Sequence, residues 1–267
     1  MSAPTTTSAD RTVTPGFGQT LRSEWVKLTS VRSTWWTVVA IFVIGGGLTT
    51  LMGWANADWL ASAEADESVG SFVTWGMMIA PVAAVSLGAL AVTSEYGSGM
   101  IRSTFAATPA RGAVLAAKAL VVAGVLLVVG TLAALIGYVG SNHFFETEGI
   151  GLPLEGDVAR AIYGSGLYLA GIGVMTVAVG FLVRHTAGAI SLMLAVLLVL
   201  GNMAMLVPGA FGDWLVKLMP GNAGSPVSTV VSFNPDLLDA WPGFGVFVAE
   251  TALLVAAAWL LLRRRDA

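Results

Sequence analysis

The sequence contains no cysteine, and only 11% of its 267 residues are charged. The lack of cysteine excludes disulfide bonds and thiolate metal sites. Soluble domains carry about 25% charged residues, so the scarcity of charge indicates a chain that lies largely in lipid. Histidine is scarce too: His143 and His185 are separated by a predicted membrane span, and near His143 only Glu146 and Glu148 offer further ligands. No metal site is predicted.

Lysine occurs three times, and the residues before the lysines are Val26, Ala117 and Val216. The loop G-x-x-x-x-G-K-[ST], which cradles the phosphates of ATP, needs a glycine before its lysine. The chain therefore cannot supply that loop. Because no Ser, His and Asp residues fall at one depth of the predicted membrane either, we expect a protein that is not an enzyme and that binds no cofactor itself.

Apolar residues, by contrast, make up 56% of the sequence. They form six runs of about 20 residues or more, the length of helix that crosses the hydrocarbon core of a bilayer. Transmembrane strands would instead alternate polar and apolar residues over about 10 positions. The sequence predicts an all-α membrane protein whose six-span transmembrane domain covers 35–262, with spans at about 35–54, 72–93, 113–140, 160–183, 187–207 and 243–262.

The charges divide unequally between the two sides of this arrangement. With both termini on one side, that side receives 11 of the 13 basic residues, whereas the loops of the other side are acidic. Basic loops stay in the cytoplasm, so both termini are predicted to be cytoplasmic in a bacterial-type plasma membrane. The basic side holds Arg11, Arg22, Lys27, Arg32, Arg102, Arg111, Lys118, Arg184, Arg263, Arg264 and Arg265.

The chain before the first span has two parts. Residues 1–19 are rich in Ser, Thr, Pro and Gly, which predicts a disordered tail. Over 20–34 apolar residues recur at helical spacing, which predicts an amphipathic interfacial helix with Trp25 among the lipid headgroups. A plain extension of the first span is the alternative. The span itself is expected to remain in the chain, because its apolar run exceeds that of a signal peptide.

Further elements flank the last span. Phe211–Met219 and Asn234–Trp241 each have the composition of a short helix, with the breaker PGNAGSP between them, and are predicted to lie at the outer membrane surface. After the last span, 263–267 is predicted to form a basic cytoplasmic tail.

A polar segment, SEYGSGMIRSTFAATPARG, lies between the second and third predicted spans. Ser94 is predicted to cap a short helix that crosses the cytoplasmic membrane face and ends near Phe105. Gly97 and Gly99 each cost a helix about 1 kcal/mol, which indicates a turn or a close backbone approach there. The alternative is an ordered connector with no partner.

The next helix is predicted to begin at Thr108 as its cap, with Pro109 in its first turn. Arg111 and Lys118 lie near its inner end. Their long side chains are expected to reach back to the interface and place their charges in water.

Two patterns of this chain recur in a known family. One is E-W-x-K-L-x-S-x-R near the N-terminus, and the other is S-E-Y-x-S-G-x-I-R…P-x-R…K after the second span. With six spans between about 20 and 262, the order of parts resembles the membrane subunits of type-2 ATP-binding-cassette (ABC) exporters. The matching residues are Glu24, Trp25, Lys27, Leu28, Ser30 and Arg32, then Glu95, Tyr96, Ser98, Gly99, Ile101, Arg102, Pro109, Arg111 and Lys118.

The resemblance implies a permease subunit, and the apolar spans favour export of an apolar or amphipathic small molecule or lipid. ATP and Mg²⁺ would bind a separate cytoplasmic ATP-binding subunit, and a second copy or a related permease subunit would complete the dimer in the lipid bilayer. No nucleic acid partner is expected. The interfacial helix, with Glu24, Trp25, Lys27 and Arg32, would lie beside a coupling helix that contacts the ATPase. That contact would involve Glu95, Tyr96, Gly97, Ser98, Gly99, Met100, Ile101 and Arg102.

Glu250 is the one acid within the apolar stretches of the spans. Such a residue usually faces a cavity or a partner, which makes Glu250 a candidate for the translocation path. A proton-coupled secondary carrier would use it as a relay, although carriers usually show repeats and more intramembrane charges. A neutral or bonded acid without a transport role is the other interpretation, and a non-transporting membrane subunit is a third possible function.

Overall fold

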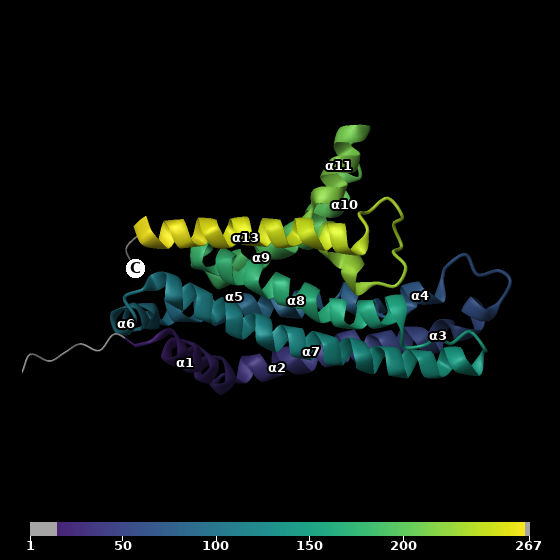
Figure 1. The fold of residues 1–267 in the computed structure, drawn as a ribbon, viewed down its shortest axis with the longest axis horizontal. Coiled ribbons are helices and arrows are strands. Elements are labelled where there is room, and N and C mark those ends of the chain that lie inside the picture. Colours follow the sequence, from purple (N-terminus) through teal and green to yellow (C-terminus); the bar gives the residue numbers. More distant parts are fainter. Residues whose placement is uncertain (1–14, 265–267) are drawn as a thin grey trace, which may run out of the picture.

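The computed structural model describes residues 15–264. Within that range the chain is helical without strands, and its long helices run side by side along one axis (Figure 1). The prediction of an all-α membrane protein is confirmed. Five helical stretches of the described chain are long and apolar enough to cross a membrane: Arg32–Ala61, Arg111–Thr147, Gly156–Val183, Thr186–Ala204 and Ala240–Arg264.

The N-terminal helix and the first span are separate elements. Helix α1 (Phe17–Ser30) ends before Val31, whose extended backbone (φ −94°, ψ 129°) breaks the helix. Helix α2 (Arg32–Ile41), the π-helix η1 (Phe42–Leu48) and α3 (Thr49–Ala61) then continue without a break. A plain extension of the span is therefore wrong. Helix α1 begins three residues earlier than predicted, and the tail 1–14 lies outside the described residues.

The segment predicted as the second span is not one continuous helix. Helix α4 (Val69–Phe72) and the 3-10 helix η2 (Trp75–Met78) precede α5 (Pro81–Ser98). Pro81 lies in the first turn of α5, where its missing N–H is tolerated, but its ring prevents the helix from continuing backward. The apolar run concealed this boundary, and the prediction of an unbroken helix over 72–93 is wrong.

Other parts of the protein compensate for the break before α5. The N–H of Gly76 donates to Thr49 Oγ1 at 2.8 Å, and the hydroxyl of Thr74 donates to the carbonyl of Ser228 at 2.7 Å. Non-helical backbone at membrane depth is tolerated where it is buried in protein in this way.

Helix α8 (Gly156–Val183) lies at the centre of the bundle. It packs against α5, α7 (Arg111–Thr147) and α13 (Ala240–Arg264). A Cβ atom added to Gly88 of α5 would lie 2.8 Å from the carbonyl oxygen of Gly173 of α8, so glycine permits this close contact. About two thirds of the apolar part of α8 is buried, against about a fifth for α13.

The chain between α8 and α13 forms the outer part of the fold. Helix α9 (Thr186–Leu194), the π-helix η3 (Ala195–Leu200) and α10 (Gly201–Ala204) lead to α11 (Ala210–Leu218), which projects from the bundle in Figure 1. Helix α11 begins and ends within one residue of the predicted helix Phe211–Met219.

The two other outer predictions are wrong. Instead of breaking the chain, PGNAGSP forms α12 (Pro220–Gly224) and part of η4 (Ser225–Ser228), which pack against α8 and α13. The segment 234–241 forms no separate helix, because the side-chain oxygen of Asn234 accepts from the N–H of Asp236 at 3.0 Å and closes a turn. Helix α13 then begins at Ala240.

Candidate functional site

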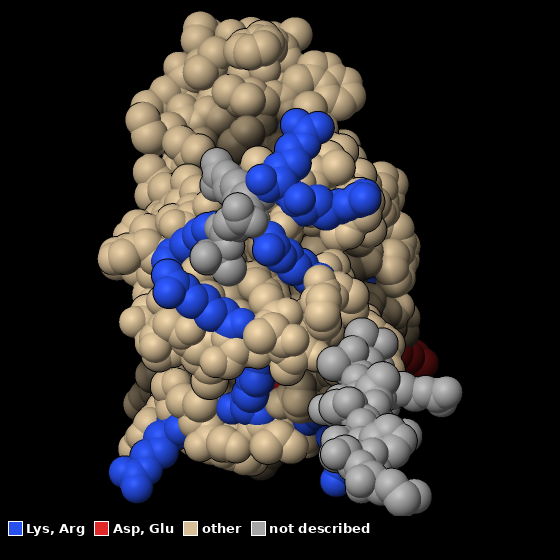
Figure 2. All heavy atoms as spheres, turned by 90° about the vertical axis from the view of Figure 1, so that its left-hand side faces the viewer, with Lys and Arg blue, Asp and Glu red and all other residues tan. Residues whose placement is uncertain are grey.

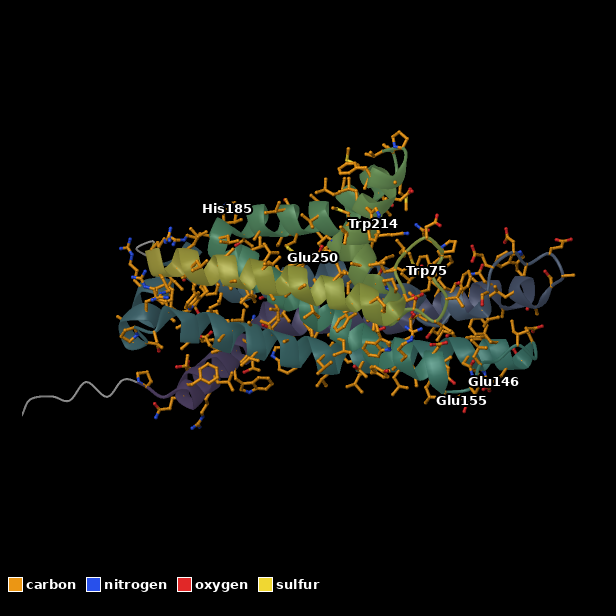
Figure 3. All side chains as sticks on the ribbon, turned by 45° about the horizontal axis from the view of Figure 1, so that its top comes forward. Trp75, Glu146, Glu155, His185, Trp214 and Glu250 are labelled. Atoms are coloured by element: carbon orange, nitrogen blue, oxygen red, sulfur yellow. The ribbon has the colours of Figure 1, made fainter. Side chains whose placement is uncertain are left out.

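The two ends of the bundle differ in charge. Many Lys and Arg side chains lie on the end that carries α1, α6 (Met100–Ala107) and the last turn of α13, which we call the basic end (Figure 2). Glu146 and Glu155 lie toward the other end, far from His185 (Figure 3). Because the positive-inside rule places basic loops in the cytoplasm, the basic end is the side expected to be cytoplasmic.

A single glycine separates α5 from α6 at the basic end. Gly99 has φ 75° and ψ 0°, a left-handed conformation that ends α5 and precedes the first residue of α6. Glycine adopts this conformation without the penalty that a Cβ atom brings. The expected turn is therefore at Gly99, whereas Gly97 lies within α5 with no atom near its missing Cβ.

The expected caps of this segment lie elsewhere. Ser94 is in α5, where its hydroxyl donates to the Leu90 carbonyl at 2.6 Å, so it caps no helix. The segment predicted as a coupling helix is thus the end of α5 followed by α6, rather than one helix from Ser94 to Phe105. Thr108 ends α6 by donating its N–H to the Thr104 carbonyl at 2.9 Å, and α7 begins at Arg111. An inverse γ-turn delays the start: Ala110 has φ −73° and ψ 77°, and the N–H of Arg111 donates to the Pro109 carbonyl at 2.9 Å.

Helix α6 has a buried and an exposed face. Ile101 and Phe105 are 3% and 8% exposed and pack into the core. Met100 is 43% exposed, and Arg102 is exposed as well. The exposed surface, which we call the α6 surface, consists of Gly97, Ser98, Gly99, Met100, Arg102, Ser103, Ala106 and Ala107.

Beneath α6 lies a cluster of four charged side chains from three helices, which we call the charge cluster. Lys118 of α7 contacts Glu24 of α1 at 2.7 Å and Glu95 of α5 at 2.5 Å. Lys27 of α1 contacts Glu24 at 2.7 Å and Glu95 at 3.0 Å. The hydroxyl of Thr104 joins α6 to the cluster, because it donates to Glu95 at 2.9 Å and accepts from Lys27 at 3.1 Å.

Every ammonium donor of the charge cluster has a partner. Lys27 donates to Glu24, Glu95 and Thr104, and Lys118 donates to Glu24, Glu95 and the carbonyl of Ala91 at 2.9 Å. Buried charges are tolerated when they are paired and hydrogen-bonded in this way. The two carboxylates balance the two ammonium groups, so the cluster is neutral as a whole.

The surroundings shift the pKa values of Lys27 and Glu95 toward the charged forms. Burial disfavours the charge on Lys27, but its hydrogen bonds to Glu24 and Glu95 outweigh this and raise its pKa. Burial likewise favours neutral Glu95, but Lys118 and Lys27 outweigh it and lower the pKa of this carboxyl. Both groups are therefore charged at neutral pH.

These positions correct one expectation from the sequence. Lys118 does not reach back to water: it is 3% exposed, because the two carboxylates beside it supply partners within the protein. Glu24 lies on the buried face of α1, 4% exposed, where it contacts Lys118 and Lys27. Trp25 is half exposed, as an interfacial helix requires, and Arg32 is exposed at the start of α2.

A second contact holds α6 against the last helix. The guanidinium of Arg111 donates to the Leu262 carbonyl at 3.1 Å and lies 5.4 Å from the centre of the Phe105 ring. Like Lys118, Arg111 is thus engaged within the protein. On the other side of α5, the ring of Tyr96 lies 5.2 Å from the Arg184 guanidinium and 6.3 Å from the Phe181 ring.

The structure therefore divides the predicted coupling residues. Glu95 and Ile101 are buried, Tyr96 is half-buried, and the others belong to the α6 surface. Glu95 thus has a role inside the protein, between α1, α6 and α7. The sequence contained a signal for this: between residues 15 and 264, Glu24 and Glu95 are the only acidic residues on the predicted cytoplasmic side of the membrane, which is otherwise basic.

The remaining candidates lie apart from the charge cluster. Glu250 is partly exposed in α13, and its Oε2 is buried without a hydrogen-bond partner in the described structure (Figure 3). His185 caps α9 by accepting from the N–H of Gly188 at 3.2 Å. Within residues 15–264, no three His, Cys, Asp or Glu side chains are placed to hold a metal ion.

Comparison of the sequence with protein-family models and with curated proteins finds no match. The function is therefore inferred from the charge cluster, the α6 surface and the resemblance in sequence patterns.

Proposed function

We propose that the protein is the membrane permease subunit of an ABC exporter, with the α6 surface as its contact to a cytoplasmic ATP-binding subunit. One observation carries the proposal: the inner face of α6 is attached to the bundle, and its outer face is exposed at the basic end. Ile101, Phe105 and Thr104 attach its inner face to the core and the charge cluster, whereas Met100 and Arg102 stay exposed. A helix that transmits force from a partner needs both properties.

The charge cluster gives this force a route into the membrane. A displacement of α6 acts on Thr104, which bonds Glu95 of α5 and Lys27 of α1, and Lys118 extends the network to α7. An ATP-binding subunit that contacts α6 differently with and without ATP would shift the population between inward-open and outward-open arrangements of these helices. This chain itself performs no covalent chemistry.

An exporter permease of this kind has six spans, one more than the five long apolar helical stretches described above. Helix α5, with the η2 segment before it, would serve as the second of six spans, and both termini would face the cytoplasm of a bacterial-type plasma membrane. A second copy or a related permease subunit would pair with it in the bilayer, and ATP and Mg²⁺ would bind the partner. The apolar helices favour an apolar or amphipathic small molecule or lipid as cargo.

The test reverses the character of the α6 surface without touching the charge cluster. The double variant Met100→Asp, Arg102→Glu should insert in the membrane normally, and its purification from native membranes in mild detergent should recover less than a tenth of the wild-type co-purifying ATPase activity. Arg22→Glu, an exposed charge reversal on α1 at the same end, is the matched control. Undiminished ATPase recovery with the double variant would refute the proposal.

A specific observation favours a second candidate, a proton-coupled carrier. The buried and unbonded Oε2 of Glu250 could accept a proton during transport. In that case transport into vesicles would persist without ATP, collapse with a protonophore, and be lost in Glu250→Gln. A permease driven by ATP would show the opposite dependence on ATP and protonophore. If neither condition supports transport, the third possibility, a non-transporting membrane subunit, is favoured.

A further inference from the structure

Beside the charge cluster lies a cavity of about 380 Å³. It is lined by α1, the start of α2, α5, Met100 of α6 and α7, and it lies partly open between the interfacial helix and the bundle. This size falls at the lower end of the range for ligand pockets in proteins, about 300–1,000 Å³. Its apolar wall consists of Leu28, Val31, Leu87, Leu90, Val121 and Val122.

The cavity is amphipathic. Its apolar wall is formed by Leu28 of α1, by Val31 directly after that helix, and by aliphatic side chains of α5 and α7, whereas Glu24, Lys27, Glu95 and Lys118 line its polar part. These four charges pair with one another and sum to zero, so they offer a ligand polarity without net charge. An occupant with a long apolar part and a polar end matches this lining.

A charge at the cavity margin determines which polar end fits. Arg32, between the lining residues Val31 and Ser33, is exposed and lies outside the neutral charge cluster, so it adds a positive charge at the margin. Each Lys or Arg near a membrane surface attracts anionic lipid by about 1 kcal/mol, so an anionic headgroup complements this margin.

We propose that the cavity binds one anionic phospholipid of the surrounding membrane. An acyl chain lies against the apolar wall, and the phosphate lies at the margin beside Arg32. Helix α1 packs against the bundle around this lipid, which fills the space between them. The proposal concerns a bound membrane lipid rather than a transported one, and it does not depend on the proposed export function.

The proposal predicts selective lipid retention. The purified full chain is delipidated by detergent washing, mixed with phosphatidylglycerol or phosphatidylcholine of identical acyl chains, and examined by native mass spectrometry. Wild type should retain one phosphatidylglycerol per chain, at least tenfold more often than phosphatidylcholine. Arg32→Gln should reduce this preference several-fold, because it removes a charge at the margin.

Filling the cavity should abolish retention. Leu90→Trp places a larger side chain in the cavity and should lower bound phosphatidylglycerol at least tenfold. Leu132→Trp, which changes an exposed leucine of α7 outside the cavity, is the matched control and should bind like wild type. Ala91→Leu fills the same space with a smaller side chain and is used if Leu90→Trp does not fold. A variant counts as folded when its melting temperature and its elution volume equal those of wild type.

Three results would overturn the proposal. Equal retention of phosphatidylglycerol by wild type and a folded cavity-filled variant would show that the lipid binds elsewhere. Equal retention of the two lipids by wild type would exclude selection of an anionic headgroup. Failure of wild type to retain either lipid would exclude a lipid site altogether.

Discussion

Replacing Lys118 by methionine should strongly destabilise the protein. The substitution keeps most of the side-chain volume but removes the ammonium group that contacts both Glu24 and Glu95, which are 4% and 2% exposed. Two buried carboxylates then share one partly exposed ammonium, that of Lys27. Breaking a buried ion pair by removing one partner costs about 3–5 kcal/mol. With about 2–4 °C per kcal/mol for domains of roughly this size, the melting temperature should fall by about 6–20 °C.

The assay is thermal unfolding of the detergent-purified protein, followed by the loss of the monodisperse elution peak after heating. Lys217→Met, which removes a lysine of α11 outside the charge cluster, is the matched control. Adding Glu95→Gln to Lys118→Met balances one carboxylate against one ammonium and should restore at least half of the lost stability. A fall of less than about 2 °C in the melting temperature of Lys118→Met corresponds to less than about 1 kcal/mol and would refute the electrostatic role of the cluster.

Three further predictions concern pH and the glycines. The pKa of Glu95 is lowered from 4.5, so the stability that this carboxylate contributes is present above pH 4.5 and is lost as the pH falls through the pKa of the folded state. The pKa of Lys27 is raised from 10.5, so the stability that this ammonium contributes is present below pH 10.5 and is lost as the pH rises through the pKa of the folded state. Melting temperature should therefore fall on both sides of a broad neutral range, and Glu95→Gln should flatten the acid side; a wild-type profile unchanged down to pH 3, about 1.5 units below that ordinary value, would contradict this. Gly99→Ala should cost about 1–2 kcal/mol because φ is 75°, whereas Gly97→Ala, within α5 and without close neighbours, should stabilise by up to about 1 kcal/mol; denaturant titration separates the two, and equal effects would argue against the turn at Gly99. Gly88→Ala should cost about 1–3 kcal/mol, since its Cβ would meet the Gly173 carbonyl at 2.8 Å, and a neutral result in the same titration would show that α5 and α8 can separate.

The apolar runs predicted the helical membrane fold well, because a span must bury about 20 residues whatever its neighbours are. They predicted boundaries less well. Pro81 begins α5 within a run that is apolar on both sides of it, and PGNAGSP, rich in residues that usually break helices, forms helical turns packed between α8 and α13. In both places, contacts with distant segments decide the local structure, and a single sequence does not contain those contacts.

The sequence predicted which segments form the candidate site, but not which of their side chains are buried or what those side chains contact. The patterns around Glu24 and Glu95 placed two important segments on the same side of the membrane, and the cost of Gly97 and Gly99 indicated a turn. That Glu95 bonds inward while Arg102 points outward depends on the turn at Gly99, which changes the direction of the chain between them. Lys118 was assigned to water because its partners lie 23 and 94 residues away in sequence.

The charge cluster also sets an order for biosynthesis. Glu24 and Lys118 are 94 residues apart, so Glu24 leaves the ribosome well before its buried partner exists. At about 5–20 residues per second, the wait is about 5–20 s. During that time the partner of Glu24 within the charge cluster is Lys27, three residues along α1. The charge cluster can therefore form completely only after α7 has been inserted. The final docking of α1, the first helix, is thus a late event in assembly.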